Sequence, residues 1–120
     1  MIGKLFLILV RYSAPSSRVD APLEWGEEAV VAERLGPYVK DFRVERRAVR
    51  FRALSAEDWV EFMRTHFGPA IEAFEYSNTP AAQADLAQKM AALMREHNGA
   101  QNGTVLGNSE YLEIVATRSK

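Results

Sequence analysis

Two histidines, His66 and His97, are the side chains best suited to acid–base chemistry or to metal binding. A zinc site on a helix normally pairs a histidine with a second one four residues on, or with nearby cysteines. These two histidines lie far apart along the chain, and the sequence has no cysteine, so we expect no metal site. His97 follows Arg95 near a predicted helix end, where it can stabilise the helix terminus. For His66 two roles stay open, a histidine at the edge of the core or one that faces a substrate.

Five arginines form the densest group of charges in the sequence: Arg43, Arg46, Arg47, Arg50 and Arg52. Because side chains alternate along a strand, Arg50 and Arg52 share its polar side and could bind phosphate or an acidic substrate. We favour a solvated strand face paired with Glu45 and other carboxylates, since the net charge of the chain is -1. The same charge balance argues against a nucleic-acid partner.

The glycines near the C-terminus, Gly103 and Gly107, superficially resemble a phosphate-binding loop. Such loops follow a strand and precede a helix, whereas these glycines follow a predicted helix and lead into the last strand. A Ser-His-Asp arrangement in recognisable local context is also missing. The sequence therefore predicts no catalytic residues that work as a self-contained set.

Length and composition predict one globular domain over residues 1–120. The chain has 48% hydrophobic and 26% charged residues, as ordinary globular proteins do. The apolar run that starts at Leu5 stops at Arg11, which is too short for a signal peptide or a membrane-spanning helix. We expect a cytoplasmic protein with no membrane partner, and the lack of cysteine is compatible with that compartment.

The first third of the chain predicts two helices joined by an irregular connection. The apolar run favours a helix over Ile2–Tyr12, and the serines and prolines of Ser13–Pro22 indicate an exposed connection. A second helix is expected over Trp25–Leu35, because Gly36-Pro37 supplies a stop signal.

A strand is predicted over Val39–Ala53 from a hydrophobic period of two. Phe42 and Val44 alternate with charged residues, and Val49 and Phe51 do the same in the opposite phase. A bulge or bend in the arginine-rich stretch between the two pairs would bring them to a common face.

Helices are predicted from Ser55 to about Asn98. Ser55 is a typical N-cap with Asp58 three residues later, and Thr79-Pro80 starts another helix. Gly68-Pro69 predicts a kink or a new helix between them. The expected apolar stripes comprise Trp59, Phe62, Met63 and Phe67 in the first part and Leu86, Met90, Leu93 and Met94 in the last.

The last predicted element is a strand over Tyr111–Thr117, whose two faces are both mostly apolar. Such a strand is typical of a sheet that is covered on both sides. The fold class is therefore α+β, mostly helical, with a pair of strands. Because two strands make a poor independent sheet, we expect a partner to complete it.

Five short segments together resemble a known family. They are Ile2-Gly3-x-Leu5-Phe6, Pro22-Leu23-x-Trp25-Gly26, Val49-x-Phe51-x-x-x-Ser55-x-Glu57-x-Trp59, Gly68-Pro69 and Glu110-Tyr111-Leu112-x-x-Val115-Ala116. Their order and spacing resemble the C-terminal portion of class I S-adenosylmethionine-dependent methyltransferases of the type 11 group. The resemblance covers nearly the whole chain.

The resemblance implies that Val39–Ala53 contains the sixth strand of a Rossmann-like sheet and that Tyr111–Thr117 is the seventh, antiparallel strand. The strands that carry the cofactor site in this family have no counterpart here, so we expect no cofactor to bind the isolated chain. S-adenosylmethionine is implied for a complete family member. Family position suggests Tyr12, Trp25 and His66 as candidates for lining a substrate pocket, with packing between helices as an equal alternative.

The family also implies where a partner would bind. Its seventh strand lies between the fifth and the sixth, so one edge of Tyr111–Thr117 would be unpaired and available to another chain. We expect either a homodimer through this edge or a complex with a chain that carries the cofactor-binding strands. Two functions follow: the substrate-side part of a small-molecule methyltransferase, inactive alone, or a non-enzymatic homodimeric remnant or small-ligand binding module.

Overall fold

The protein has an α+β fold, seen here in a computed structural model that describes residues 1–15 and 22–119. The α-helices are α1 (Ile2–Leu9), α2 (Glu28–Leu35), α3 (Ala56–His66), α4 (Gly68–Tyr76) and α5 (Pro80–Glu96). Three short 3-10 helices are η1 (Val10–Tyr12), η2 (Pro22–Gly26) and η3 (Gly36–Tyr38), and the strands are β1 (Val39–Ala53) and β2 (Val105–Arg118). The predicted order of elements and the mostly helical α+β class are confirmed.

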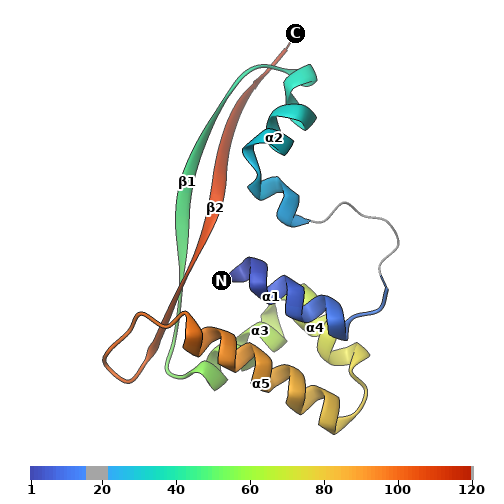
Figure 1. Cartoon of the computed structure of the whole chain (residues 1–120), viewed down its shortest axis with the longest axis vertical. Helices are drawn as coiled ribbons and strands as arrows, with labels where there is room; N and C mark the ends of the chain where they lie inside the picture. Colours follow the sequence, from blue (N-terminus) through green and yellow to red (C-terminus); the bar gives the residue numbers. More distant parts are fainter. Residues whose placement is uncertain (16–21, 120) are drawn as a thin grey trace. The chain divides into compact units, whose positions relative to one another are not determined.

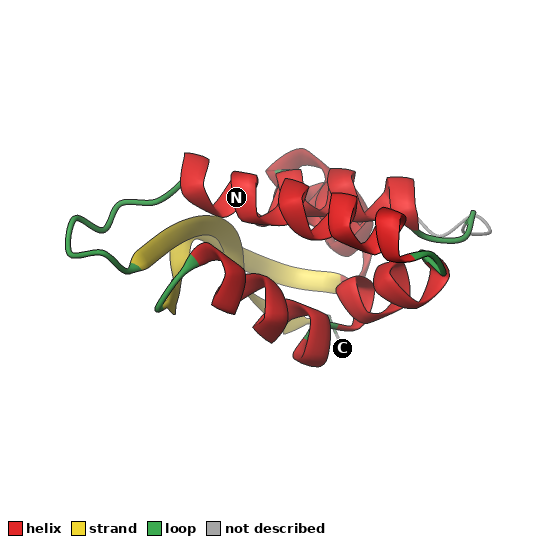
Figure 2. Ribbon diagram, turned by 90° about the horizontal axis from the view of Figure 1, so that it is seen from below, coloured by secondary structure: helices red, strands yellow, loops and turns green. Residues whose placement is uncertain are grey.

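The two strands pair side by side in a two-stranded sheet (Figures 1 and 2). The backbone N–H of Ser119, just after β2, donates to the carbonyl oxygen of Tyr38, just before β1, at 3.1 Å. The end of one strand therefore meets the start of the other, and the pair is antiparallel. Further along, Arg47 of β1 forms an ion pair with Glu113 of β2 at 2.9 Å.

The chain divides into two compact units, and the division falls within the two strands. The helical unit comprises residues 1–17 and 50–109, and the strand unit comprises residues 18–49 and 110–120. Most of the predicted connection Ser13–Pro22 lies outside the described residues. The expectation of a single domain stays a prediction.

Helices α1, α3, α4 and α5 of the helical unit pack on one another around one apolar core (Figure 1). Leu5 of α1, Trp59 of α3 and Leu86 of α5 are almost completely buried. The three helices that carry these residues each present an apolar stripe at helical spacing, and such stripes drive the packing of helices. The stripe predicted for α5 is confirmed, because Leu86, Met90, Leu93 and Met94 are all buried.

The helix boundaries follow the predicted capping signals. The Ser55 hydroxyl oxygen accepts the backbone N–H of Asp58 at 3.0 Å, and the Thr79 hydroxyl oxygen accepts that of Ala82 at 3.2 Å. Pro69 begins a new helix, α4, rather than kinking α3. The stripe predicted for α3 is wrong at Phe62, which is 55% exposed, while Val60 is buried in its place.

Strand β2 begins at Val105, well before the predicted start at Tyr111. The difference arises at Gly107, which was predicted to lie in a turn and lies inside the strand. A Cβ atom at Gly107 would come within 2.5 Å of the Met1 sulphur and 3.1 Å of the Met94 sulphur. Glycine therefore allows the ends of two methionine side chains to approach the strand closely, and a larger residue would displace them. The turn glycine is Gly103, whose φ is +82°.

The strand unit has a much smaller core. Among the described residues of the strand unit, Val31 of α2 is the one buried hydrophobic residue. Tyr111 and Val115 of β2 are about half exposed. Helix α2 begins at Glu28, later than the predicted Trp25, which instead lies in η2. In the described part of the chain, no helix is both long enough and apolar enough to cross a membrane.

Candidate functional site

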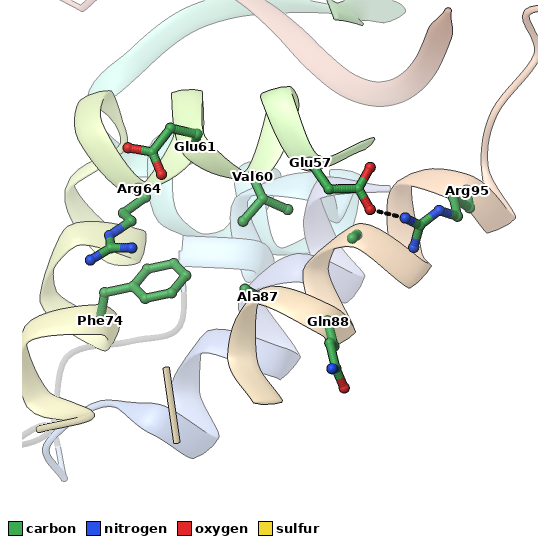
Figure 3. Close-up of a pocket in the computed structure, with 9 residues that line it drawn as sticks. Glu57, Val60, Glu61, Arg64, Phe74, Ala87, Gln88 and Arg95 are labelled. Atoms are coloured by element: carbon green, nitrogen blue, oxygen red, sulfur yellow. Dashed lines mark hydrogen bonds and ion pairs between the residues drawn. The ribbon is translucent and has the colours of Figure 1, made fainter. Parts of the chain in front are cut away.

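The helical unit carries a surface groove of about 360 Å³ between α3, α4 and α5 (Figure 3). Its floor is apolar and is formed by Val60 of α3, Phe74 of α4, and Ala87 and Ala91 of α5. The two alanines leave room on α5, and the ring of Phe74 forms one wall of the space. A groove of this size, largely apolar with a few polar groups at its rim, is typical of small-molecule sites.

The rim of the groove carries charged groups toward both ends. Glu57 and Arg95 form an ion pair that links α3 to α5 (Figure 3). The guanidinium of Arg64 lies 5.0 Å from the centre of the Phe74 ring, a cation–π contact. Glu61 also lines the groove next to Arg64. The arrangement can hold a small molecule with an apolar body and polar ends, and it brings together no nucleophile and base.

The groove residues are positioned by the helix signals of the sequence. Glu57 and Asp58 lie in the first turn of α3, where carboxylates are stabilised by the helix N-terminus. Arg95 lies in the last turn of α5, where the helix C-terminus stabilises a cation. Each helix terminus therefore stabilises one charge of the Glu57–Arg95 pair.

Tyr12, the first predicted pocket residue, forms a polar network with α5. Its hydroxyl donates to the carboxylate of Asp85 and accepts from the ammonium of Lys89. Lys89 also lies 5.1 Å from the centre of the Tyr12 ring. The bonds from Lys89 and from Tyr12 hold the pKa of Asp85 below its usual value, and the bond to Asp85 raises the pKa of Lys89. Tyr12 thus joins η1 to α5.

His66, the second predicted pocket residue, is the last residue of α3 and is exposed. Its ring stacks on Phe62 with the ring centres 4.7 Å apart, and its Nδ1 atom lies 3.1 Å from the Phe62 carbonyl oxygen. Nδ1 is also 2.6 Å from the Thr65 hydroxyl. The partners of His66 are all on its own helix, so it does not share the partners of Tyr12.

Trp25, the third predicted pocket residue, belongs to the strand unit and is 43% exposed. The guanidinium of Arg34 on α2 lies 5.1 Å from the centre of its ring. Arg34 also forms an ion pair with Glu24. Tyr12, Trp25 and His66 do not line the groove described above, and their role in a substrate pocket stays a prediction.

The arginines of β1 separate into two sets. Arg43, Arg46 and Arg47 form ion pairs with Glu45, Glu28 and Glu113, as expected for a solvated strand face. The hydrogen bond and charge of Glu113 raise the pKa of Arg47 further above its usual value. The guanidinium groups of Arg50 and Arg52 form no ion pair with any described residue.

The two glycines of the C-terminal part lie in different surroundings. Gly103 lies in the loop after α5, and the space above Gly107 is filled by Met1 and Met94. The described residues contain no group of three or more histidines and carboxylates that could hold a metal ion. Whether the chain binds S-adenosylmethionine, the cofactor that the family resemblance implies, is not decided by these residues and stays a prediction.

The groove was not predicted from the sequence. Its lining combines Glu57 and Arg64 of α3 with Phe74 of α4 and Arg95 of α5, and only the packing of three helices brings them together. The alanines of α5 were the one available signal, because small residues on a helix allow a concave surface. In comparisons with known proteins, no family model and no curated protein matches the chain.

Proposed function

We propose that this chain forms the substrate-side part of an S-adenosylmethionine-dependent methyltransferase that acts on a small molecule. In this proposal, β1 and β2 are the sixth and seventh strands of the enzyme's sheet. The cofactor-binding strands belong to another segment or another chain, so the 120-residue chain alone has no activity. The five segments that resemble the family, from Ile2 to Ala116, support this assignment.

The observation that carries the proposal is the exposed antiparallel strand pair. Strands β1 and β2 are 15 and 14 residues long, whereas strands of about 5–6 residues are typical. Large apolar side chains along them are exposed, including Val49 at 41%, Tyr111 at 46% and Val115 at 54%. An isolated two-stranded sheet is only marginally stable in water. Further strands along β2 would pair its free edge, and elements packed on the faces of the enlarged sheet would cover these side chains.

The contribution of this chain to methyl transfer would be to bind and orient the acceptor. Correct placement of two reactants can supply a large part of the rate enhancement in a displacement of this kind. The groove lined by Val60, Phe74 and Ala91 offers an apolar surface for the body of the acceptor. The charges of Arg64 and Arg95 at its rim could fix its polar groups.

The decisive test is the coding DNA upstream of Met1. We expect it to encode a Gly-x-Gly-x-Gly segment, in frame or shifted by one base, that can be joined to the chain. Calorimetry should then detect S-adenosylmethionine binding to the joined protein and none to the 120-residue chain. Unrelated sequence upstream would exclude a cofactor-binding segment joined to this chain and would favour the second candidate function below. Methyl transfer by the chain alone would contradict the proposal.

A second candidate function is a non-enzymatic small-ligand binding module, which would form a homodimer through β2. The groove between α3 and α5 favours it, because the groove is complete within the helical unit and needs no further strand. Light scattering and the upstream DNA sequence, taken together, distinguish the two candidate functions. A stable dimer combined with unrelated upstream sequence would favour the binding module.

A further inference from the structure

A second cavity of the helical unit, of about 240 Å³, lies where β1 ends and α3 begins. Its walls are mainly apolar and are formed by Phe51, Leu54, Trp59 and Phe62. Leu54 is 78% exposed and Phe62 is 55% exposed, so the cavity is open to solvent at this side. Sites for drug-sized ligands span about 300–1,000 Å³, so this cavity suits a smaller molecule.

Arg52 provides the positive charge of this cavity. It lines the cavity, and its guanidinium forms no ion pair or hydrogen bond with any described residue. The one carboxylate in the lining, that of Asp58, is already engaged, because it accepts a hydrogen bond from the Ser55 hydroxyl at 2.7 Å. Asp58 also lies in the first turn of α3, where the helix N-terminus compensates its charge. Arg52 is left as the charged group that can take a counter-ion.

Trp59 forms a buried part of the cavity wall and also holds a polar atom without a partner. The residue is 1% exposed and lines the cavity, and its Nε1 atom is buried without a hydrogen-bond partner among the described residues. Most buried polar groups in proteins are hydrogen-bonded, and each exception calls for an explanation. The cavity therefore combines one unpaired cation, Arg52, with mainly apolar walls.

We propose that this cavity binds a small carboxylate with an apolar or aromatic body. The carboxylate pairs with the guanidinium of Arg52, where two parallel hydrogen bonds are geometrically favoured. The body packs between Phe51, Leu54 and Phe62, against Trp59. Binding of this kind needs the helical unit alone, so it does not depend on the proposed methyl transfer.

The test uses phenylacetate as the probe and a Trp25→Phe variant of the full chain, so that Trp59 is the one indole present. Titration is followed by tryptophan fluorescence and by the NMR signal of the indole N–H. We expect a saturable change in fluorescence and a saturable shift of the indole proton signal. Phenethylamine, which has the same ring and the opposite charge, should give neither.

Two matched variants locate the charge. Arg52→Gln should weaken phenylacetate binding about ten-fold, the factor that a charge-assisted hydrogen bond contributes. Arg50→Gln, two residues earlier on the same side of β1 and outside the cavity lining, should leave it unchanged. Equal responses to phenylacetate and phenethylamine would overturn the proposal. So would equal losses in the two variants, or no saturable response to phenylacetate.

Discussion

The helical unit and the strand unit are stabilised by different interactions. In the helical unit, Leu86, Met90 and Met94 are completely buried in one apolar cluster. In the strand unit, ion pairs such as Arg46–Glu28 and Arg47–Glu113 link exposed side chains. Burying a large apolar side chain contributes about 1.5–3 kcal/mol, whereas an exposed ion pair contributes about 0–1 kcal/mol. The helical unit therefore has the larger share of the folding free energy.

This difference separates two kinds of function. The two cavities described above lie within the helical unit, where rigid packing can hold a ligand site in shape. The exposed apolar side chains of the strands, such as Tyr111 and Val115, lie in the strand unit. We propose that ligand binding belongs to the first unit and partner binding to the second.

Core truncation should give the largest effect and tests the comparison directly. Leu86→Ala should lower the free energy of unfolding by about 2–5 kcal/mol, because it leaves a cavity in the main core. Val31→Ala in the strand unit should cost less, since fewer methyl groups are removed from a smaller core. Urea unfolding followed by circular dichroism measures both. Equal losses would show that the two units are stabilised alike.

Charge at the β2 edge should give the next largest effect. In a two-fold antiparallel pair centred within Tyr111–Thr117, Val115 of one chain faces Glu113 of the other. Val115→Glu would place two carboxylates opposite each other at both symmetric positions, and like charges directly opposite destabilise a strand pair. We expect dimerisation to weaken about ten-fold, since each contact is worth roughly 0.2–1 kcal/mol.

Val115→Lys is the matched control, because it places a cation opposite Glu113 and should preserve the dimer. Size-exclusion chromatography with light scattering gives the mass of each variant. A dimer that both substitutions weaken equally would argue against this register. A wild-type chain that is monomeric at micromolar concentration would exclude pairing through β2 altogether.

Much of the fold could be predicted because its signals are local. Ser55 and Thr79 cap helices through groups only three residues away, and the period of two identified β1 with its correct bounds. The start of β2 could not be predicted, because the side chains that lie against Gly107, those of Met1 and Met94, are distant in sequence. A glycine inside a strand and a glycine in a turn look the same in the sequence.

The candidate sites were harder to predict, because they too depend on contacts between residues that are distant in sequence. The lining of the groove comes from three helices, and the unused donor of Trp59 becomes evident only when its surroundings are known. Phe62 has the spacing of a core residue, yet it is exposed and stacks on His66. Hydrophobic periodicity alone thus cannot distinguish a core position from a wall of an open cavity.

Loss of a helix cap should give a moderate effect confined to the helical unit. Thr79→Ala removes the acceptor for the Ala82 backbone N–H and should cost about 1 kcal/mol of unfolding free energy. Thr65→Ala is the control, because that hydroxyl donates to the Glu61 carbonyl within α3 and caps no helix. Urea unfolding gives the two values, and the mass of the chain in solution should not change. A change in oligomeric state on Thr79→Ala would show that the stability of the helical unit affects association through the strand unit, contrary to our proposal.

The Tyr12–Asp85–Lys89 network should give the smallest effect, because its side chains are exposed. The bonds from Lys89 and Tyr12 lower the pKa of Asp85 below its ordinary value of 3.8, so the folded chain favours the carboxylate. A lowered pKa stabilises the fold above the unfolded value, and the contribution is lost as the pH falls through the folded value. The difference in unfolding free energy between wild type and Asp85→Asn should be constant at neutral pH and shrink below about pH 4. Lys89→Gln should reduce this pH dependence, because it removes the main cause of the shift. A difference that grows toward acid would contradict the network as described.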